Sequence, residues 1–307
     1  MRVTFLGTGG AVPTTERNPS SVLVNREGDR LLFDVAEGTQ RQMMRFGTGF
    51  TISDVFVTHL HGDHVLGLPG LVQTMDFNDR EKALCIYAPA GIEEEETDAL
   101  VHAANTQPSF PVHVYGVEPG EVAVRRDDYE VRVFEVDHRT NAVGYALVED
   151  ERKGRFDRET AEELGVPVGP KFSKLHEGDP VELDDGTVVE PEQVVGDPRP
   201  GRTFVYTGDT RPSDEVVAAA EDADLLVHDA TFADDRRERA AETGHSTARQ
   251  AAEIASRADA ERLALTHISS RYAGDVSDHL AEAREAFDGE VFAPDDGEIR
   301  EIPYPDA

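Results

Sequence analysis

The segment VFVTHLHGDH, residues 55–64, places side chains that can bind metal ions directly after an apolar run. The run at 55–57 is typical of a buried strand, and three imidazoles and one carboxylate follow it, at His59, His61, Asp63 and His64. Burying such groups without partners is unfavourable, so their position at a strand end needs a chemical reason. Imidazole and carboxylate together suit zinc or another first-row divalent ion, which makes a metal site the first hypothesis.

The spacing of these residues favours two binding points rather than one. In an extended backbone, residues two apart face the same way, so His59 and His61 can converge on one ion. Gly62 then allows a turn, which aims Asp63 and His64 toward a second point. The alternative is a chance cluster of internally satisfied histidines, and the regular spacing argues against it.

Three further candidate ligands stand where other predicted strands end. His138 comes two residues after VRVFEV, Asp209 follows TFVYTG, and His267 follows RLALT. Strand ends are the usual location of sites in α/β folds. A lone histidine in such a place is more often structural, but three coordinating residues in equivalent places, together with the first motif, favour a metal centre.

The elements that must position these residues form a mixed pattern. Strand-like runs recur at 2–6, 21–24, 30–34, 54–58, 84–87, 131–136, 203–207, 225–229 and 262–266. Helical patterns lie between them, at 38–46, 212–220 and 240–258. In the last, Ser246 or Thr247 is a candidate N-cap, and Gln250 is a capping-box partner for Thr247. Strands and helices mixed through both halves predict a layered α/β domain with sheets inside and helices outside.

The segment from about 150 to 200 differs from the rest, with six prolines and few apolar runs. It also holds Lys153, Lys171 and Lys174, three of the four lysines of the chain, near Arg152 and Arg155. We interpret it as an inserted arm rather than as part of the core. Its basic side chains form either a solvated face or a phosphate-binding surface.

The charge balance is strongly acidic, with 62 acidic and 30 basic residues and a net charge of −32. This composition favours a protein that works in concentrated salt, where the Debye length falls to about 3 Å at 1 M and self-repulsion is screened. The alternative is a protein that binds cations or basic partners. Acidity by itself argues against a nucleic-acid partner at ordinary salt.

Other features of the composition narrow the cellular setting. The single cysteine, Cys85, excludes a disulfide framework. No stretch of 18 apolar residues is present and the first residues do not read as a signal peptide, so we expect a soluble, cytoplasmic protein without a membrane partner.

Two sets of motifs carry a resemblance to known families. THLHGDH, FEVDHRT, YTGDT and LTHIS resemble the metallo-β-lactamase superfamily. GTGGAVPTTERNPSS, LVHDATF, GHSTARQAAEIA and THISSRY resemble, more narrowly, the ribonuclease Z family of transfer-RNA 3′ processing endonucleases. The resemblance implies a single metallo-β-lactamase-like domain over 1–307, an αββα four-layer sandwich with a protruding, flexible arm inserted at about 150–180.

The resemblance also implies a metal content and a ligand set. It implies two Zn²⁺ per subunit, with Mn²⁺ able to substitute. One ion would be held by His59, His61 and His138. The other would be held by Asp63, His64 and His267. Asp209 would bridge the two.

The chemistry implied is hydrolysis of a phosphodiester in precursor tRNA, which removes the 3′ trailer and leaves a 3′-hydroxyl. Hydroxide activated by the two metals would attack the phosphorus, with Asp63 as the base and His245 assisting the leaving oxygen. Asp229, where the family usually has glutamate, could orient the His245 imidazole or simply cap a strand end. The resemblance further implies a homodimer, and no DNA partner is expected.

The candidate RNA contacts also come from the resemblance. They are Arg17, Asn18, Arg152, Lys153, Arg155, Gly169, Pro170 and Arg271. The chain departs from the family at Thr15, where a lysine is common, and at Ser173, where a glycine is common. Two alternatives remain: a small-molecule phosphodiesterase or aryl-sulfatase-like hydrolase, and a non-catalytic metal-binding RNA scaffold.

Overall fold

Two seven-stranded sheets form the centre of the larger of two units in this computed structural model, which describes residues 1–103 and 107–305. The larger unit comprises Met1–Val148 and Arg202–Pro303. The second unit comprises Glu149–Gly201 together with the C-terminal residues from Tyr304. It therefore includes the segment predicted as an arm and extends past it to Gly201.

The first sheet combines antiparallel and parallel pairs. Its strand order is β18 (Ile299–Glu301), β1 (Arg2–Gly7), β3 (Ser21–Arg26), β4 (Asp29–Phe33), β5 (Asp54–Phe56), β6 (Leu84–Pro89) and β7 (Val112–Val117). Strands β4 to β7 are parallel, so their carboxyl ends meet at one edge. His59 follows β5 at that edge.

The second sheet has the same number of strands. Its order is β17 (Glu290–Phe292), β15 (Arg262–Thr266), β14 (Leu225–Asp229), β13 (Thr203–Tyr206), β10 (Val143–Glu149), β9 (Tyr129–Glu135) and β8 (Val122–Arg125). Strands β13, β14, β15 and β17 are parallel, which brings the residues that follow β13, β14 and β15 to one edge. A short parallel pair, β2 (Gly9–Gly10) with β16 (Ile268–Ser269), joins the two halves beside that edge.

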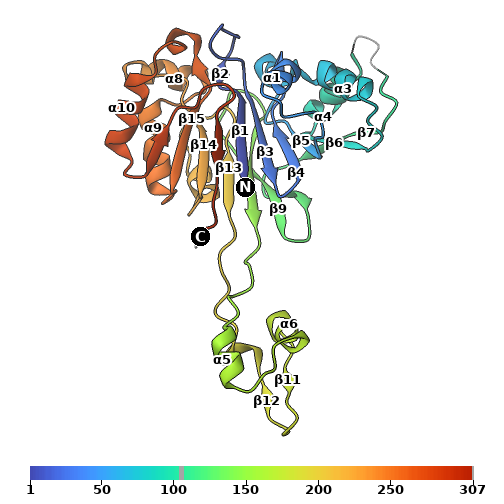
Figure 1. Ribbon diagram of the computed structural model, residues 1–307. Helices are drawn as coiled ribbons and strands as arrows, with labels where there is room; N and C mark the ends of the chain where they lie inside the picture. Colours follow the sequence, from blue (N-terminus) through green and yellow to red (C-terminus); the bar gives the residue numbers. More distant parts are fainter. Residues whose placement is uncertain (104–106, 306–307) are drawn as a thin grey trace. The chain divides into compact units, whose positions relative to one another are not determined.

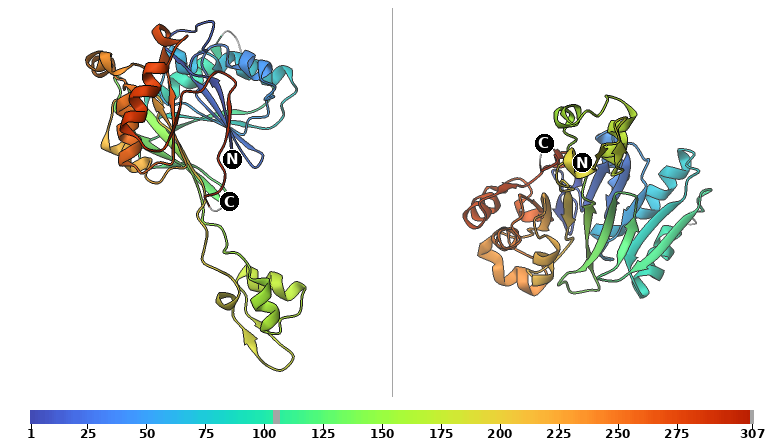
Figure 2. Two further views of the ribbon diagram at one scale, coloured as in Figure 1. Left: turned by 60° about the vertical axis from the view of Figure 1, so that its left-hand side comes forward. Right: turned by 90° about the horizontal axis from the view of Figure 1, so that it is seen from below.

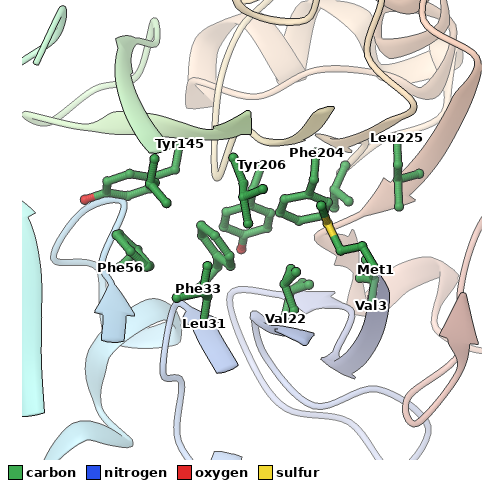
Figure 3. Close-up of a cluster of buried hydrophobic side chains, with 14 of the residues drawn as sticks. Met1, Val3, Val22, Leu31, Phe33, Phe56, Tyr145, Phe204, Tyr206 and Leu225 are labelled. Carbon is green, nitrogen blue, oxygen red and sulfur yellow. The ribbon is translucent and has the colours of Figure 1, made fainter. Parts of the chain in front are cut away.

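A hydrophobic core fills the space between the sheets. Phe33 and Phe56 of the first sheet point toward Tyr145, Phe204 and Tyr206 of the second, as Figure 3 shows. Phe33 lies 5.0 Å from Phe56 and 5.4 Å from Phe204, measured between ring centroids. Aromatic pairs at these separations add to the stability that area burial provides.

Helices cover the outer face of each sheet. On the first sheet they are α1 (Thr39–Arg45), α2 (Gly62–Val65), α3 (Leu68–Phe77) and α4 (Ile92–Val101). On the second they are α7 (Asp214–Ala219), α8 (Arg237–Thr243), α9 (Ala248–Arg257) and α10 (Ser277–Ala286). Figures 1 and 2 show the resulting order of layers, with two sheets between two groups of helices. The predicted αββα architecture is confirmed.

The nine predicted strands are present, and others were missed. Strand β10 is one of these, because Gly144 obscured its apolar pattern. A Cβ at Gly144 would lie 2.2 Å from the Phe134 ring, so the glycine makes room for that side chain. Strands β7, β8, β17 and β18 lie at or near the sheet edges, where exposed positions weaken the apolar signal.

The prediction of one long helix over 240–258 is wrong. Helix α8 ends at Thr243, Gly244 takes a left-handed conformation with φ of 84°, and α9 begins at Ala248. The predicted cap is confirmed, because Thr247 is the N-cap of α9 and forms a capping box with Gln250. The break matters because it places His245 in the connection between the helices.

The second unit is small and has its own core. It contains α5 (Arg158–Glu163), α6 (Pro170–Glu177) and the hairpin of β11 (Val181–Glu182) with β12 (Val188–Val189). Its fully buried apolar side chains are Ala161, Val166, Leu175, Val181, Val189 and Val194. Among the helices of residues 1–103 and 107–305, we find none with the length and apolarity needed to cross a membrane.

Candidate metal centre

The HLHGDH segment connects β5 to α2 and turns within a few residues. His61 is the N-cap of α2 and has extended backbone angles, with φ of −64° and ψ of 147°. Gly62 is the first residue of α2 and does not adopt a positive φ, so the turn does not need the conformational freedom of glycine. A Cβ at Gly62 would lie 2.8 Å from the end of the Leu66 side chain, which is half exposed and can move aside.

Three histidines and Asp209 form the first candidate ligand group. His59 Nε2 lies 2.9 Å from His61 Nδ1, and His138 Nε2 lies 3.3 Å from the same atom. Asp209 Oδ2 is 3.7 Å from His59 Nε2 and 4.0 Å from His138 Nε2. These atoms surround a point that one divalent ion with nitrogen and oxygen ligands would fit.

The second group lies on the other side of the Asp209 carboxylate. Asp209 Oδ1 is 3.2 Å from both His64 Nε2 and His267 Nε2. Asp63 Oδ2 is 3.1 Å from His267 Nε2 and 3.7 Å from His64 Nε2. The two oxygens of Asp209 therefore face different ligand groups, and this carboxylate lies between them.

Unsatisfied buried atoms support a cation here. Within the described part of the chain, His64 Nε2 and Asp209 Oδ1 are buried and have no hydrogen-bond partner, although they lie only 3.2 Å apart. Leaving buried polar atoms unpaired is costly. Neutral imidazole nitrogens and carboxylate oxygens aimed at common points fit a divalent metal ion, so the residues present suit such a group.

Side chains behind the ligands fix their orientation. His64 Nδ1 lies 2.7 Å from Asp34 Oδ2, and Tyr206 donates its hydroxyl hydrogen to the same oxygen at 2.9 Å. His59 Nδ1 lies 3.0 Å from Thr58 Oγ1, which also donates to Asp34. Such partners hold a metal-binding imidazole in the correct ring orientation and tautomer.

Asp34 was missed by the sequence analysis. It is fully buried and directly follows β4, in the sequence LLFD. A carboxylate at the end of a buried apolar run is the same signal that identified His59. We overlooked it because Asp34 was counted as the last residue of a strand rather than as a site residue.

The first group is made of imidazoles that burial keeps neutral. Burial lowers the pKa of His59 well below its usual value and also lowers the pKa values of His61 and His138. A neutral imidazole offers a lone pair to a metal ion. His138 Nδ1 faces the Gly244 carbonyl oxygen at 2.7 Å, which directs Nε2 toward the centre.

The second group is dominated by ion pairing. Burial alone would lower the pKa values of His64 and His267, but the negative charge of Asp209 has a larger, opposite effect. The pKa of His267 is raised to about 9, and the pKa of His64 is raised well above its usual range. Burial would raise the pKa of Asp209, but His267 and His64 hold it well below its usual range. A divalent ion bound here displaces these protons, since metal ligands must be deprotonated.

His245 and Asp229 form a pair beside the centre. His245 Nδ1 is 2.9 Å from Asp229 Oδ2 and 3.8 Å from Asp209 Oδ2. Asp229 also accepts hydrogen bonds from the amides of Thr210 and Thr231 and from the Thr231 hydroxyl. Asp229 therefore meets both descriptions left open by the sequence: it fixes the strand end and contacts the imidazole.

The other histidines stay outside the centre. In the described residues, no candidate metal cluster includes His102, His113, His176, His228 or His279. From the sequence we interpret these five histidines, which lack metal-ligand spacing, as structural or surface residues, and their placement agrees with this.

The N-terminal candidates for RNA contact serve the fold. Arg17 is 3% exposed, and its Nη1 donates to the Thr8 hydroxyl and to the Pro294 carbonyl, both at 2.6 Å. Asn18 donates its amide to Asp296 at 2.7 Å and its side chain to the Glu37 carbonyl at 3.0 Å. Such burial argues against a direct RNA contact by Arg17. Thr15, by contrast, is exposed.

The remaining candidates divide between the two units. Arg271 is exposed and lines a cleft beside His245 and His267. In the second unit, Lys153 and Arg155 are exposed, while the Arg152 guanidinium lies 3.6 Å from the centre of the Tyr304 ring. Gly169 has a φ of 145° and caps α6, whose first residue is Pro170. Ser173 lies inside α6, where serine has a better helix propensity than the family's glycine.

Comparison with known proteins agrees with this geometry. A family model described as "Beta-lactamase superfamily domain" matches residues 29–268. Ribonuclease Z of Natronomonas pharaonis is 68% identical over 306 residues, covering 100% of this chain and 99% of that protein. Ribonuclease Z of Haloferax volcanii is 66% identical over 307 residues, covering 100% and 96%. Both sources are halophilic archaea, as the acidic composition suggested.

A solved structure extends the comparison to three dimensions. The crystal structure of the short form of human tRNase Z superimposes with a TM-score of 0.71 at 28% identity, covering 99% of this chain and 100% of that one. The fold, the family model and the His/Asp cluster define a protein of the metallo-β-lactamase class with a centre suited to divalent metal ions. Within that class, the chain belongs to the ribonuclease Z family and is a hydrolytic endoribonuclease.

Proposed function

We propose that the chain is a zinc-dependent endonuclease that removes the 3′ trailer from precursor tRNA and leaves a 3′-hydroxyl on the tRNA. The observation that carries the proposal is the meeting of two candidate ligand groups on either side of Asp209, with His245 3.8 Å from it. The names of the full-length relatives, ribonuclease Z and tRNase Z, support the substrate.

Two zinc ions, with Mn²⁺ able to replace them, would be held by the residues of the two groups. His59, His61 and His138 would hold one ion and Asp63, His64 and His267 the other, with Asp209 shared between them. When bound, such ions neutralise charge on the phosphodiester oxygens and lower the pKa of water. The remaining parts of the mechanism belong to the side chains.

Asp63 is the proposed proton acceptor on the side of attack. Its Oδ2 accepts the Ala11 amide hydrogen at 2.7 Å and lies 3.1 Å from His267 Nε2, which fixes the carboxylate. Within the described residues no hydrogen bond is made to its Oδ1. That oxygen is therefore available to take the proton of the attacking water.

His245 is the proposed proton donor on the leaving side. Its Nδ1 faces Asp229, so its Nε2 is the nitrogen available to a substrate. The Asp229 carboxylate orients the imidazole, whose Nε2 can donate a proton to the departing 3′-oxygen as the phosphorus–oxygen bond breaks. The break between α8 and α9 leaves the His245 ring at the cleft surface rather than inside a helix.

The second unit is proposed as the flexible arm that grips the tRNA away from the cut. Arg152, Lys153 and Arg155 would contact phosphates, which position the substrate without reading its sequence. We also propose a homodimer and a cytoplasmic location. In concentrated salt, phosphate contacts weaken, so binding must also depend on shape and on ligation at the centre.

The test is incubation of the protein with a 3′-extended precursor tRNA in high salt, with Zn²⁺ or Mn²⁺, followed by mapping of the cut. Cleavage directly after the discriminator nucleotide is expected. Indiscriminate trimming, or hydrolysis of a small phosphodiester without cleavage of the precursor, would point to a small-molecule phosphodiesterase instead.

A further inference from the structure

A cleft of about 360 Å³ opens beside the candidate metal centre, on the side of His245 and His267. Its walls come from distant parts of the larger unit: Gly10 and Ala11 after β1, Arg139 after β9, Arg239 in α8, and the 269–271 segment after β15. Position 10 needs glycine, because a Cβ there would lie 2.5 Å from the His267 ring. The cleft and the centre therefore share a wall.

The lining of this cleft is basic. Arg139, Arg239 and Arg271 line it, and no carboxylate does. Each of the four other clefts that we compared has at least one acidic lining residue, among them Asp79, Glu215, Glu290 and Glu121. In a chain with a net charge of −32, three arginines without an acidic neighbour in the lining mark an exception.

These arginines are also available to a ligand. Many arginines of the protein are paired, such as Arg126 with Asp54 at 2.9 Å and Arg257 with Asp214 at 2.6 Å. Within the described residues, neither Arg139 nor Arg271 forms an ion pair. Arg239 contacts Glu242 at 3.4 Å, but both side chains are more than half exposed, so that pair is weak.

We propose that Arg139, Arg239 and Arg271 form a subsite for an RNA phosphate adjacent to the bond that is cut, on the His245 side of the centre. Guanidinium groups bind phosphate oxygens through paired N–H donors and remain charged at any relevant pH. A phosphate held here fixes the chain next to the His245 imidazole, so the three arginines position the scissile bond. The proposal deepens the proposed function and depends on it for the identity of the ligand as RNA.

Two of these residues were not found from the sequence. Arg139 directly follows the ligand His138, and this adjacency was the signal available. Arg239 lies one residue before the helix predicted at 240–258, where an exposed arginine looks like part of a solvated face. Only the fold brings both to the same cleft as Arg271.

The first test measures binding without cleavage. The probe is a 5′-phosphorylated tetraribonucleotide with a fluorescent label, titrated with the metal-loaded protein at several salt concentrations. The variant with Arg139→Gln, Arg239→Gln and Arg271→Gln should bind at least about tenfold more weakly, and its slope of log affinity against log salt should fall by about 0.7, as expected when one phosphate on a single strand is no longer neutralised. The variant with Arg41→Gln, Arg45→Gln and Arg284→Gln, three exposed arginines outside the cleft, is the matched control. Equal affinity of the triple variant and this control would overturn the proposal.

The second test is a cycle between protein and substrate. Precursor RNAs carry one uncharged methylphosphonate at successive positions around the cut, and kcat/KM is measured for the wild type and the triple variant. At one or two positions, the methylphosphonate should lower kcat/KM of the wild type by about tenfold. The same change should lower kcat/KM of the variant by less than twofold, because the arginines that would contact this phosphate are already absent. Equal losses at every position would overturn the proposal, and a partly misfolded variant would not produce the expected pattern.

The outcomes separate this proposal from the proposed function. A wild type that fails to cut the precursor refutes the tRNA substrate. In that case the tetranucleotide titration still decides whether the three arginines bind an RNA phosphate.

Discussion

The candidate metal centre of the larger unit and the Lys153 and Arg155 side chains of the second unit differ in burial. In the centre, Asp34, Asp229 and Gly244 orient the imidazoles of His64, His245 and His138. In the second unit, Lys153 and Arg155 are exposed side chains on a unit with a small core. In the proposed function, hydrolysis depends on preorganised side chains in the larger unit, while tRNA binding by the second unit depends on charge.

This difference has consequences for salt. A buried, hydrogen-bonded site is screened little by ions, whereas contacts from exposed lysine and arginine to phosphate are weakened strongly. In concentrated salt, the phosphate contacts proposed for the second unit would therefore lie close to the limit of electrostatic binding. The cleft arginines lie beside the centre, where a substrate bound as proposed would bring phosphates near them.

The largest expected effect comes from Asp209→Ala, which removes the carboxylate shared by both ligand groups. We expect hydrolysis of precursor tRNA and of a small phosphodiester to fall by at least about a thousandfold, with a loss of bound metal after dialysis, because both ligand groups are broken. Metal analysis and the two rate assays check this. Asp214→Ala, at an 85% exposed carboxylate, is the control. Retention of both metal and activity would refute the ligand assignment.

His245→Gln should have the next largest effect. We expect kcat to fall by about a hundredfold or more on both substrates, as is typical for loss of a general acid, while metal content and KM change little. The measurement is steady-state kinetics together with metal analysis. Loss of metal would show instead that His245 is a ligand. The measurement is needed because His245 lies in a cluster with Asp209, Asp229 and His267 whose atoms could hold a metal ion.

Asp34→Asn tests the support behind a ligand. The amide keeps the size of the side chain but removes the charge that faces His64 Nδ1 at 2.7 Å. Loss of such a partner typically weakens metal affinity by about 10–100-fold. Competition with a chelator measures the affinity, and excess Zn²⁺ should restore much of the activity. Full affinity in the variant would mean that Tyr206 and Thr58 suffice to hold the imidazole.

These cases also show what the sequence could and could not predict. The candidate ligands were found because each follows a strand that ends at one edge, and a strand end is visible as an apolar run. Asp34 carried the same signal but was missed, because it was assigned to the strand predicted at 30–34 rather than to the residues that follow it. The break at Gly244 was missed because the alanine face of α9 and the residues of α8 together imitate one helix.

Tertiary contacts decide the remaining cases. Arg17 was expected to contact the RNA, but it is buried against Thr8 and Pro294. Pro294 is 277 residues away from Arg17 in the chain. Gly62 was expected to supply a special backbone conformation but has an ordinary helical one, with the Leu66 side chain as its nearest neighbour. Neither can be inferred from local spacing, since each depends on which neighbours the fold supplies.

The smallest effect is expected from substitutions in the second unit. This experiment decides whether tRNA binding by the second unit is separate from hydrolysis at the candidate metal centre. The variant reverses Lys153 and Arg155 to glutamate and leaves Arg152, which packs on Tyr304, unchanged. KM for precursor tRNA should rise by about tenfold at the lowest salt that keeps the protein folded, and the difference should shrink as salt increases. Hydrolysis of a small phosphodiester should change less than twofold.

A matched control makes this result specific to the second unit. Arg41→Glu with Arg284→Glu changes the net charge by the same amount on exposed positions of the larger unit. If KM rises equally in this control, the effect comes from total charge and not from the proposed arm. If the small phosphodiester suffers as much as the precursor, the second unit influences the centre itself, and the separation of grip from chemistry is wrong.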